Sequence, residues 1–155
     1  MKVEPMKVEH RMTRDCVAVA ASATLDEVVR WMAALDCGAL PVVGDGRQVL
    51  GMVTDRDVCL LAQSRGRRLV ELRVVDAMSR EVVACAPDDD VRTAQNLMRD
   101  AQVRRLPVVD ADGVLVGVIT LGQIARAGIE RGDVSRASVG ETLAAISRPR
   151  AVSRA

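Results

Sequence analysis

The side chains best suited to chemistry lie in two short stretches of this 155-residue chain. Thr54-Asp55-Arg56-Asp57 follows an apolar run, and Arg104-Arg105 precedes another. A threonine in this place can cap the helix that follows, while the carboxylate of Asp57 can accept hydrogen bonds from both hydroxyls of a ribose. The two arginines are either exposed charges at a strand edge or phosphate contacts, for which guanidinium has a suitable fork of donors. The second interpretation of each stretch predicts a nucleotide ligand.

Other reactive side chains lack the partners that catalysis requires. His10, the single histidine, lies near the N-terminus, and the chain has no Walker-type loop and no GxGxxG motif. Asp55 and Asp57 flank Arg56, which favours acids at a helix N-terminus over a metal site. The cysteines form no CxxC motif and are expected to be inert thiols: Cys16, Cys37, Cys59 and Cys85. We therefore predict a protein that is not an enzyme, needs no cofactor and has no metal site.

The amino-acid composition limits the kinds of partner that this chain is expected to bind. The formal net charge of +1 gives no electrostatic case for nucleic acid or membrane binding. No apolar run approaches the roughly 20 residues that span a bilayer, and the N-terminus has no apolar signal region, so we expect a cytoplasmic protein. With one Trp and no Phe or Tyr, a bound base must lie among aliphatic side chains, and a stacking platform for single-stranded nucleic acid is missing.

The chain contains an internal repeat, which is its strongest organisational signal. Shifted by 66 residues, the sequence aligns with itself without a gap from Met12 to Val58. Leu40-Pro41-Val42-Val43 then falls on Leu106-Pro107-Val108-Val109, and Gly51-Met52-Val53-Thr54 falls on Gly117-Val118-Ile119-Thr120. One register kept through this many identities indicates two copies of one structural unit, repeat one and repeat two.

Each repeat predicts the same order of elements. A short β-rich run precedes a helix, which begins at the capping-box pair Thr24 and Glu27 in repeat one and after Pro87 and three aspartates in repeat two. A strand through Leu-Pro-Val-Val, a turn and a strand ending at the threonine follow, and a second helix covers about 55–63 or 121–127. The fold class is therefore α/β of the α+β type, with a small sheet and two helices in each repeat.

The repeat also divides the chain. We predict a flexible lead-in over 1–9, repeat one over 10–64, an arginine-rich linker over 65–73, repeat two over 74–128, and a partly disordered C-terminal extension over 129–155. Within the extension, Val139 to Ile146 can form one short helix that Ser138 caps.

The order of these motifs resembles the cystathionine-β-synthase (CBS) domain, and two copies in tandem resemble a Bateman module. Repeat one has the full closing motif at 51–57, Gly-Met-Val-Thr-Asp-Arg-Asp, and repeat two has the typical run Val-Arg-Arg-Leu-Pro-Val-Val-Asp at 103–110. Either motif alone is weak, but the combination is specific and covers roughly residues 10 to 128. The resemblance implies pseudo-two-fold packing of the repeats, dimerisation and a regulatory role. It also implies clefts between the repeats that bind adenine nucleotides (AMP, ADP, ATP) or related adenosyl ligands, and an effector protein that the sequence does not identify.

In the resembled family, a cleft takes its threonine and aspartate from one repeat and its base pocket and phosphate contacts from the other. The resemblance therefore implies one complete cleft, formed by Met52, Thr54, Asp57, Val82, Val83, Val103, Arg104, Arg105 and Pro107. The second cleft has Gln123 in place of the aspartate and Gly38 and Ala39 in place of the arginines, so we expect it to be empty. Gly122 stands where some relatives have a further cation, which predicts weaker phosphate binding in the complete cleft.

Two other functions stay open, a ligand-free dimeric interaction scaffold and a cysteine-based redox or metal sensor. The 66-residue offset places Cys16 and Cys37 opposite Val82 and Val103, so pseudo-symmetry would bring both thiols to the second cleft. There they either fill space as small apolar groups, form a disulfide or hold a metal. We also expect a homodimer, because two helices beside each small sheet leave apolar helix faces uncovered.

Overall fold

The computed structural model describes residues 4–132 and 134–150 and has the predicted mixed α/β architecture. The chain forms two compact units, each with a three-stranded sheet and helices. Unit 1 contains residues 1–14, 83–108 and 117–155, and unit 2 contains 15–82 and 109–116. None of the helices in the described ranges is long and apolar enough to cross a membrane.

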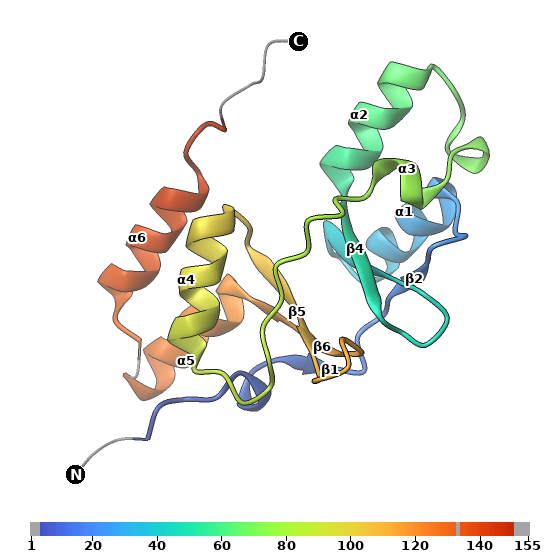
Figure 1. Ribbon diagram of the computed structural model, residues 1–155. Coiled ribbons are helices and arrows are strands. Elements are labelled where there is room, and N and C mark those ends of the chain that lie inside the picture. The colour runs from blue at the N-terminus through green and yellow to red at the C-terminus, as the bar shows by residue number, and fades with distance from the viewer. Residues whose placement is uncertain (1–3, 133, 151–155) are drawn as a thin grey trace. The chain divides into compact units, whose positions relative to one another are not determined.

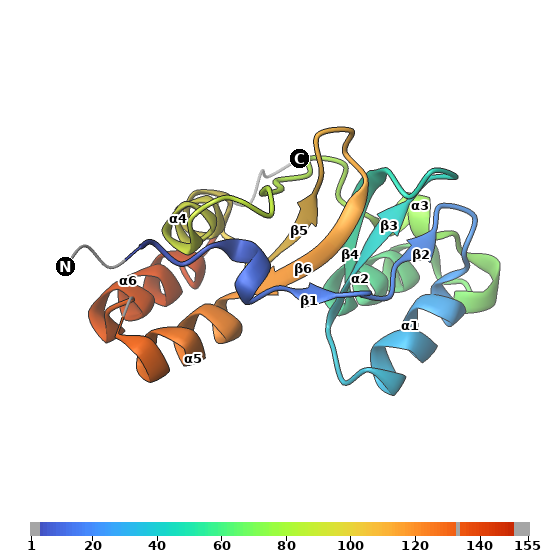
Figure 2. The same ribbon diagram turned by 90° about the horizontal axis from the view of Figure 1, so that it is seen from below.

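Unit 2 is built on the sheet β2-β3-β4, whose strands are Val19–Ala20, Ala39–Val43 and Val49–Thr54 (Figure 2). Strand β2 runs parallel to β3, and β3 runs antiparallel to β4. Helices α1 (Leu25–Ala34) and α2 (Asp55–Arg65) pack on this sheet, and the short helices η2 (Leu69–Glu71) and α3 (Val74–Ala77) pack against them. The core is aliphatic, as the composition predicts, and contains Val19, Leu25, Val28, Met32, Leu40, Val42, Val53, Val58, Leu72, Val74 and Met78.

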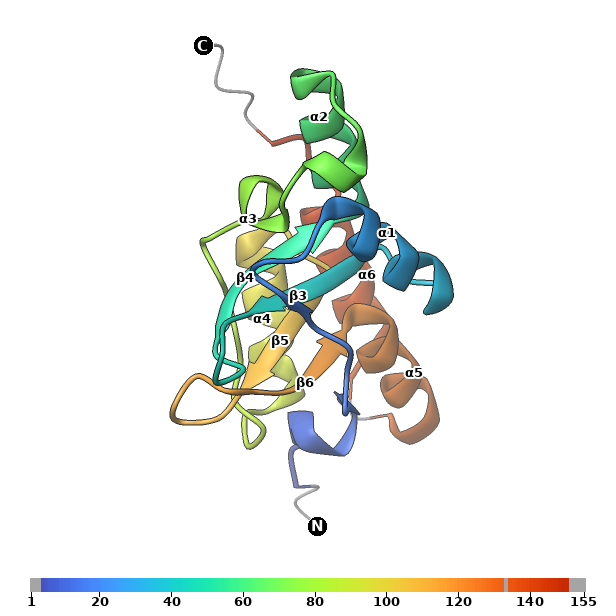
Figure 3. The same cartoon turned by 90° about the vertical axis from the view of Figure 1, so that its right-hand side faces the viewer.

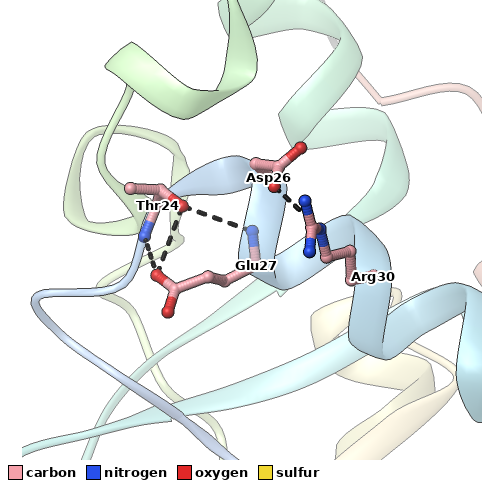
Figure 4. A network of polar contacts seen from close by, with 4 residues as sticks. All are labelled: Thr24, Asp26, Glu27 and Arg30. Atoms are coloured by element: carbon pink, nitrogen blue, oxygen red, sulfur yellow. Dashed lines mark hydrogen bonds and ion pairs between the residues drawn. The ribbon is translucent and has the colours of Figure 1, made fainter.

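Helix α1 begins at the predicted capping box (Figure 4). Thr24 Oγ1 accepts a hydrogen bond from Glu27 N at 3.3 Å, and Glu27 Oε2 accepts one from Thr24 N at 2.7 Å. These bonds hold the pKa of Glu27 below its ordinary value, because the backbone N–H of Thr24 stabilises the carboxylate. Asp26 in the same turn pairs with Arg30 at 2.9 Å. The sequence therefore located this helix start correctly.

Unit 1 combines the sheet β1-β6-β5 with three helices. The strands are Thr13–Arg14, Leu115–Thr120 and Arg105–Val109, and the helices α4 (Val91–Ala101), α5 (Leu121–Arg131) and α6 (Arg136–Ile146) pack against one another (Figure 1). The sequence predicts a flexible lead-in over 1–9, whereas Met6 and Val8 are buried in this unit. Val8 begins the 3-10 helix η1 (Val8–His10), and its N–H donates to Asp89 O at 2.9 Å. This part of the lead-in is fixed by packing and backbone hydrogen bonds.

The opening segment of each repeat pairs with the last strand of the other. Thr13 pairs with Val118 in β6, and its counterpart 66 residues later, Ser79, pairs with Met52 in β4. This pairing explains why the runs 51–54 and 117–120 both begin with glycine, because the opening segment of the other repeat passes directly over that residue. A Cβ on Gly51 would lie 2.6 Å from Ser79 O, and one on Gly117 would lie 2.8 Å from Thr13 O.

Helix α6 starts earlier than the sequence predicts. Its N-cap is Ser135, whose Oγ accepts a hydrogen bond from Ser138 N at 3.1 Å, so Ser138 lies inside the helix and the predicted cap was wrong. Gln95 on α4 is buried and fastens α6: its Nε2 donates to Ser138 O at 2.8 Å and to Thr142 Oγ1 at 2.8 Å. The extension predicted over 129–155 as partly disordered contains α6, and after this helix Gln102 Nε2 donates to Arg148 O at 3.2 Å and Arg150 Nη2 donates to Gln102 O at 2.8 Å. Residues 151–155 of the extension lie outside the described ranges.

Candidate ligand-binding site

The threonine and aspartate of the closing motif form one hydrogen-bonded group in unit 2. Strand β4 ends at Thr54, and α2 begins at the next residue. Asp57 Oδ2 accepts hydrogen bonds from Thr54 N at 2.9 Å and from Thr54 Oγ1 at 2.7 Å, while Asp57 N donates to Thr54 Oγ1 at 3.2 Å. This is a complete capping box. Thr54 thus caps α2 as the sequence predicts, and Asp57 forms the second half of the cap.

Asp57 nevertheless keeps an acceptor for a ligand. Its second carboxylate oxygen, Oδ1, has no hydrogen-bond partner in the described ranges, and the side chain is half-buried. The Thr54 hydroxyl, by contrast, uses both its proton and one lone pair within the box. The group left open for sugar hydroxyls is thus the Asp57 carboxylate. Met52 and Val82, also predicted to line the site, are half-buried in the same unit.

The equivalent residues in unit 1, Thr120 and Gln123, use their hydrogen-bonding groups within the unit. Gln123 Oε1 accepts from Thr120 N at 2.8 Å, and Gln123 N donates to Thr120 Oγ1 at 3.2 Å. The other end of the amide, Nε2, donates to Thr13 Oγ1 at 2.9 Å. Both ends of the Gln123 side chain are therefore engaged, and it has no charge to offer a sugar.

The predicted base and phosphate residues Val83, Val103, Arg104, Arg105 and Pro107 lie in unit 1. Their backbone is held by hydrogen bonds: Leu121 N donates to Arg104 O at 2.9 Å, and Cys85 N donates to Pro107 O at 3.2 Å. Arg104 is exposed and Arg105 is half-buried. Within residues 4–132 and 134–150, neither guanidinium forms a hydrogen bond or ion pair, so both keep their donors for an anion.

A carboxylate occupies the corresponding place in unit 2. Asp55 N donates to Gly38 O at 3.1 Å, and a Cβ on Gly38 would lie 2.9 Å from Asp55 Oδ2. The position equivalent to Arg104 is therefore covered by negative charge, which repels phosphate. The sequence predicted the loss of the arginines but not the position of the Asp55 carboxylate beside Gly38. The signal was present, because the 66-residue alignment sets Asp55 against the apolar Leu121.

The four cysteines are free thiols in different surroundings. Cys16 and Cys37 are half-buried in unit 2, and burial raises the pKa of Cys16. Cys59 is exposed on α2, whereas Cys85 is buried, and desolvation raises its pKa to about 12. Among the residues that the structure describes, no group of three or more His, Cys, Asp or Glu side chains is placed to hold a metal ion.

The fold and these motifs define a class of protein, a tandem pair of small α/β repeats whose last strands each end at a threonine that caps a helix. The model of the CBS domain family matches residues 7–63 and 74–130. The chain belongs to the CBS domain family, and its structural neighbours are CBS domain pairs.

Relatives of known sequence and structure agree with this assignment. The CBS domain-containing protein YhcV of Bacillus subtilis is 37% identical over 118 residues, which are 76% of this chain and 82% of YhcV. The crystal structure of CBSX2 in complex with AMP matches with a TM-score of 0.70 and 28% identity, covering 80% of this chain and 96% of that one. Hypoxic Response Protein I, known from Mycobacterium tuberculosis and crystallised with two coordinated zinc ions, matches with a TM-score of 0.72 and 28% identity, covering 78% and 98%. Some relatives are longer: the chain spans 23% of an inosine-5'-monophosphate dehydrogenase of Methanocaldococcus jannaschii.

Proposed function

We propose that this chain is a cytoplasmic regulatory module that binds one adenine nucleotide, of the AMP, ADP or ATP type, in a cleft between its two CBS repeats. The nucleotide is a signal that the module passes to an effector protein, and the module itself catalyses no reaction. The proposed lining residues are Met52, Thr54, Asp57, Val82, Val83, Val103, Arg104, Arg105 and Pro107.

The observation that carries the proposal is the unequal state of the two equivalent helix starts. Asp57 keeps a charged oxygen open, whereas Gln123 has both ends of its amide engaged. The phosphate-facing positions differ in the same sense, since Arg104 and Arg105 correspond to Gly38 and Ala39. A nucleotide needs an acceptor for its ribose and cations for its phosphates, and only the set with Asp57 and the two arginines supplies both. The AMP bound to the related CBSX2 supports an adenine nucleotide as the ligand.

Mass spectrometry tests the proposal in two steps. Small molecules released from the natively purified protein are identified first, and native spectra are then recorded after addition of AMP, ADP or ATP. We expect one nucleotide mass per chain. A protein that contains no adenine compound and acquires none on addition refutes the proposal.

We further propose that two copies form a homodimer through α1 and α2. Trp31 and Leu35 on α1 and Leu60 on α2 are 46%, 43% and 57% exposed. In unit 1 the corresponding helices, α4 and α5, are packed against α6. Grouped exposed apolar side chains mark interfaces, and closed two-fold pairing is the commonest arrangement. Light scattering at micromolar concentration should give the dimer mass, and Leu60→Arg should shift it toward the monomer; a monomeric parent chain contradicts this.

A zinc sensor is the second candidate, because the related Hypoxic Response Protein I holds two zinc ions and this chain has two half-buried thiols, Cys16 and Cys37, in one unit. Elemental analysis of the protein purified without chelator separates the candidates. Bound zinc that is lost in Cys16→Ser favours the sensor, whereas zinc-free protein with four reactive thiols after denaturation rejects it.

A further inference from the structure

Two arginines, Arg104 and Arg126, lie beside the start of α5. The first turn of α5 contains no acidic residue, whereas the first turn of α2 contains Asp55 and Asp57. Figure 3 shows the backbone of both helices. The strand residue Arg104 is tied to this helix start, because its carbonyl accepts the hydrogen bond from Leu121 N. Cations at the positive end of a helix are unfavourable unless an anion accompanies them.

The side chain of Arg126 lies at the start of α5 itself. The second residue of α5 is Gly122, and the guanidinium of Arg126, one turn further on, folds back over it: Arg126 Nη1 lies 3.8 Å from the point where a Cβ on Gly122 would stand. Thr120 Oγ1 lies at the same 3.8 Å from that point. Repeat one has the opposite arrangement, with Arg56 at the second position of its helix and Leu60 at the sixth. Repeat two thus keeps a cation near this helix start although position 122 has no side chain.

The donors of Arg126 are available. Its side chain is exposed and forms no hydrogen bond or ion pair with any residue in the described ranges. Arg104 and Arg105 likewise form no hydrogen bond or ion pair through their guanidinium groups, although Arg105 is half-buried. Among the described residues, three guanidinium groups of unit 1 therefore have no anionic partner. A single phosphate group carries about two negative charges at pH 7, which two guanidinium groups neutralise. A third arginine therefore matches a ligand with more than one phosphate.

We propose that Arg126 is a phosphate-binding residue of the nucleotide site and that it selects ADP and ATP over AMP. The inference rests on the proposed function, in which Asp57 and the aliphatic residues hold the ribose and base. It adds that the ligand is a nucleoside di- or triphosphate, and that Arg126 replaces the cation that position 122 lacks.

Calorimetry with adenosine, AMP, ADP and ATP tests the inference. Arg126→Leu, which installs the residue that repeat one has at Leu60, should weaken ADP and ATP binding about tenfold, the effect of one lost charged hydrogen bond. AMP should weaken by less than about threefold on the same scale, and adenosine should be unaffected. The matched control is Arg131→Leu, an exposed arginine on the same helix, which should leave all four affinities unchanged.

A rescue variant guards against an indirect effect. Gly122 has room for a side chain, since the nearest atoms to an added Cβ are 3.8 Å away, so Gly122→Arg in the Arg126→Leu background should restore ATP binding. Unchanged ATP affinity in Arg126→Leu, or an equal loss for adenosine and ATP, overturns the inference and leaves the proposed function standing. A parent chain that binds none of the four compounds refutes the proposed function, and the inference with it.

Discussion

Replacing Asp57 with asparagine separates the two roles of this side chain. The amide oxygen of Asn can still accept the hydrogen bond from Thr54 N, which spans 2.9 Å to Asp57 Oδ2, so α2 keeps its cap. The free energy of unfolding should change by no more than about 0.5 kcal/mol. The charge offered to the ribose is lost, and charged hydrogen bonds contribute about 1.5–3 kcal/mol each. Nucleotide affinity should therefore fall about tenfold to a hundredfold.

The matched control is Gln123→Ala in unit 1. This change removes the hydrogen bonds to Thr120 N at 2.8 Å and to Thr13 Oγ1 at 2.9 Å, so it should lower the free energy of unfolding by about 1 kcal/mol. Nucleotide affinity should stay unchanged. Calorimetry measures the affinity and urea denaturation the stability. The reasoning is refuted if Asp57→Asn binds like the parent, or if Gln123→Ala weakens binding to the same degree.

Three further outcomes are expected from packing and burial. Gly51→Ala should lower the free energy of unfolding, measured in urea, by about 1–3 kcal/mol, because the added Cβ would lie 2.6 Å from Ser79 O. In the control Gly140→Ala the added Cβ meets open space, so this change should not destabilise the protein. A greater loss of stability in Gly140→Ala than in Gly51→Ala contradicts the pairing of Ser79 with Met52. At pH 8 a thiol reagent should modify exposed Cys59 first and buried Cys85 last, and equal rates contradict the burial. Because folding raises the pKa of Cys85 from 9.0 to about 12, its stabilisation is complete below pH 9 and is lost toward pH 12. The parent should thus lose more stability than Cys85→Val between pH 8 and pH 10, and parallel losses contradict this.

The features that the sequence predicted correctly are local ones. The capping pair Thr24 and Glu27 is read from residue types three positions apart, and the starts of α2 and α5 follow from the threonines that end an apolar run. The 66-residue repeat predicted the same elements twice, and the two helices and the two later strands formed in both copies. The opening β-rich run forms strand β2 in repeat one but only the isolated bridge between Cys85 and Val108 in repeat two.

Features that depend on contacts between segments far apart in the sequence were not predicted. The pairing of Thr13 with Val118 joins segments more than a hundred residues apart, and no local pattern encodes it. Ser135 and Ser138 are equally good caps for α6 by type, and the contact with buried Gln95 places Ser138 inside the helix. For the candidate site, the sequence predicted Asp57 and the two arginines. It did not predict the hydrogen bond from Thr54 N to Asp57 Oδ2, which depends on the orientation of the Asp57 side chain.

Isothermal titration calorimetry of the unaltered chain with ATP, ADP and AMP counts directly how many nucleotides bind each chain. The unequal helix starts, with Asp57 open and Gln123 engaged, predict a stoichiometry of about one nucleotide per chain. Two sites of equal affinity would contradict the inequality between the two halves, and the absence of binding by all three nucleotides would contradict the regulatory role itself.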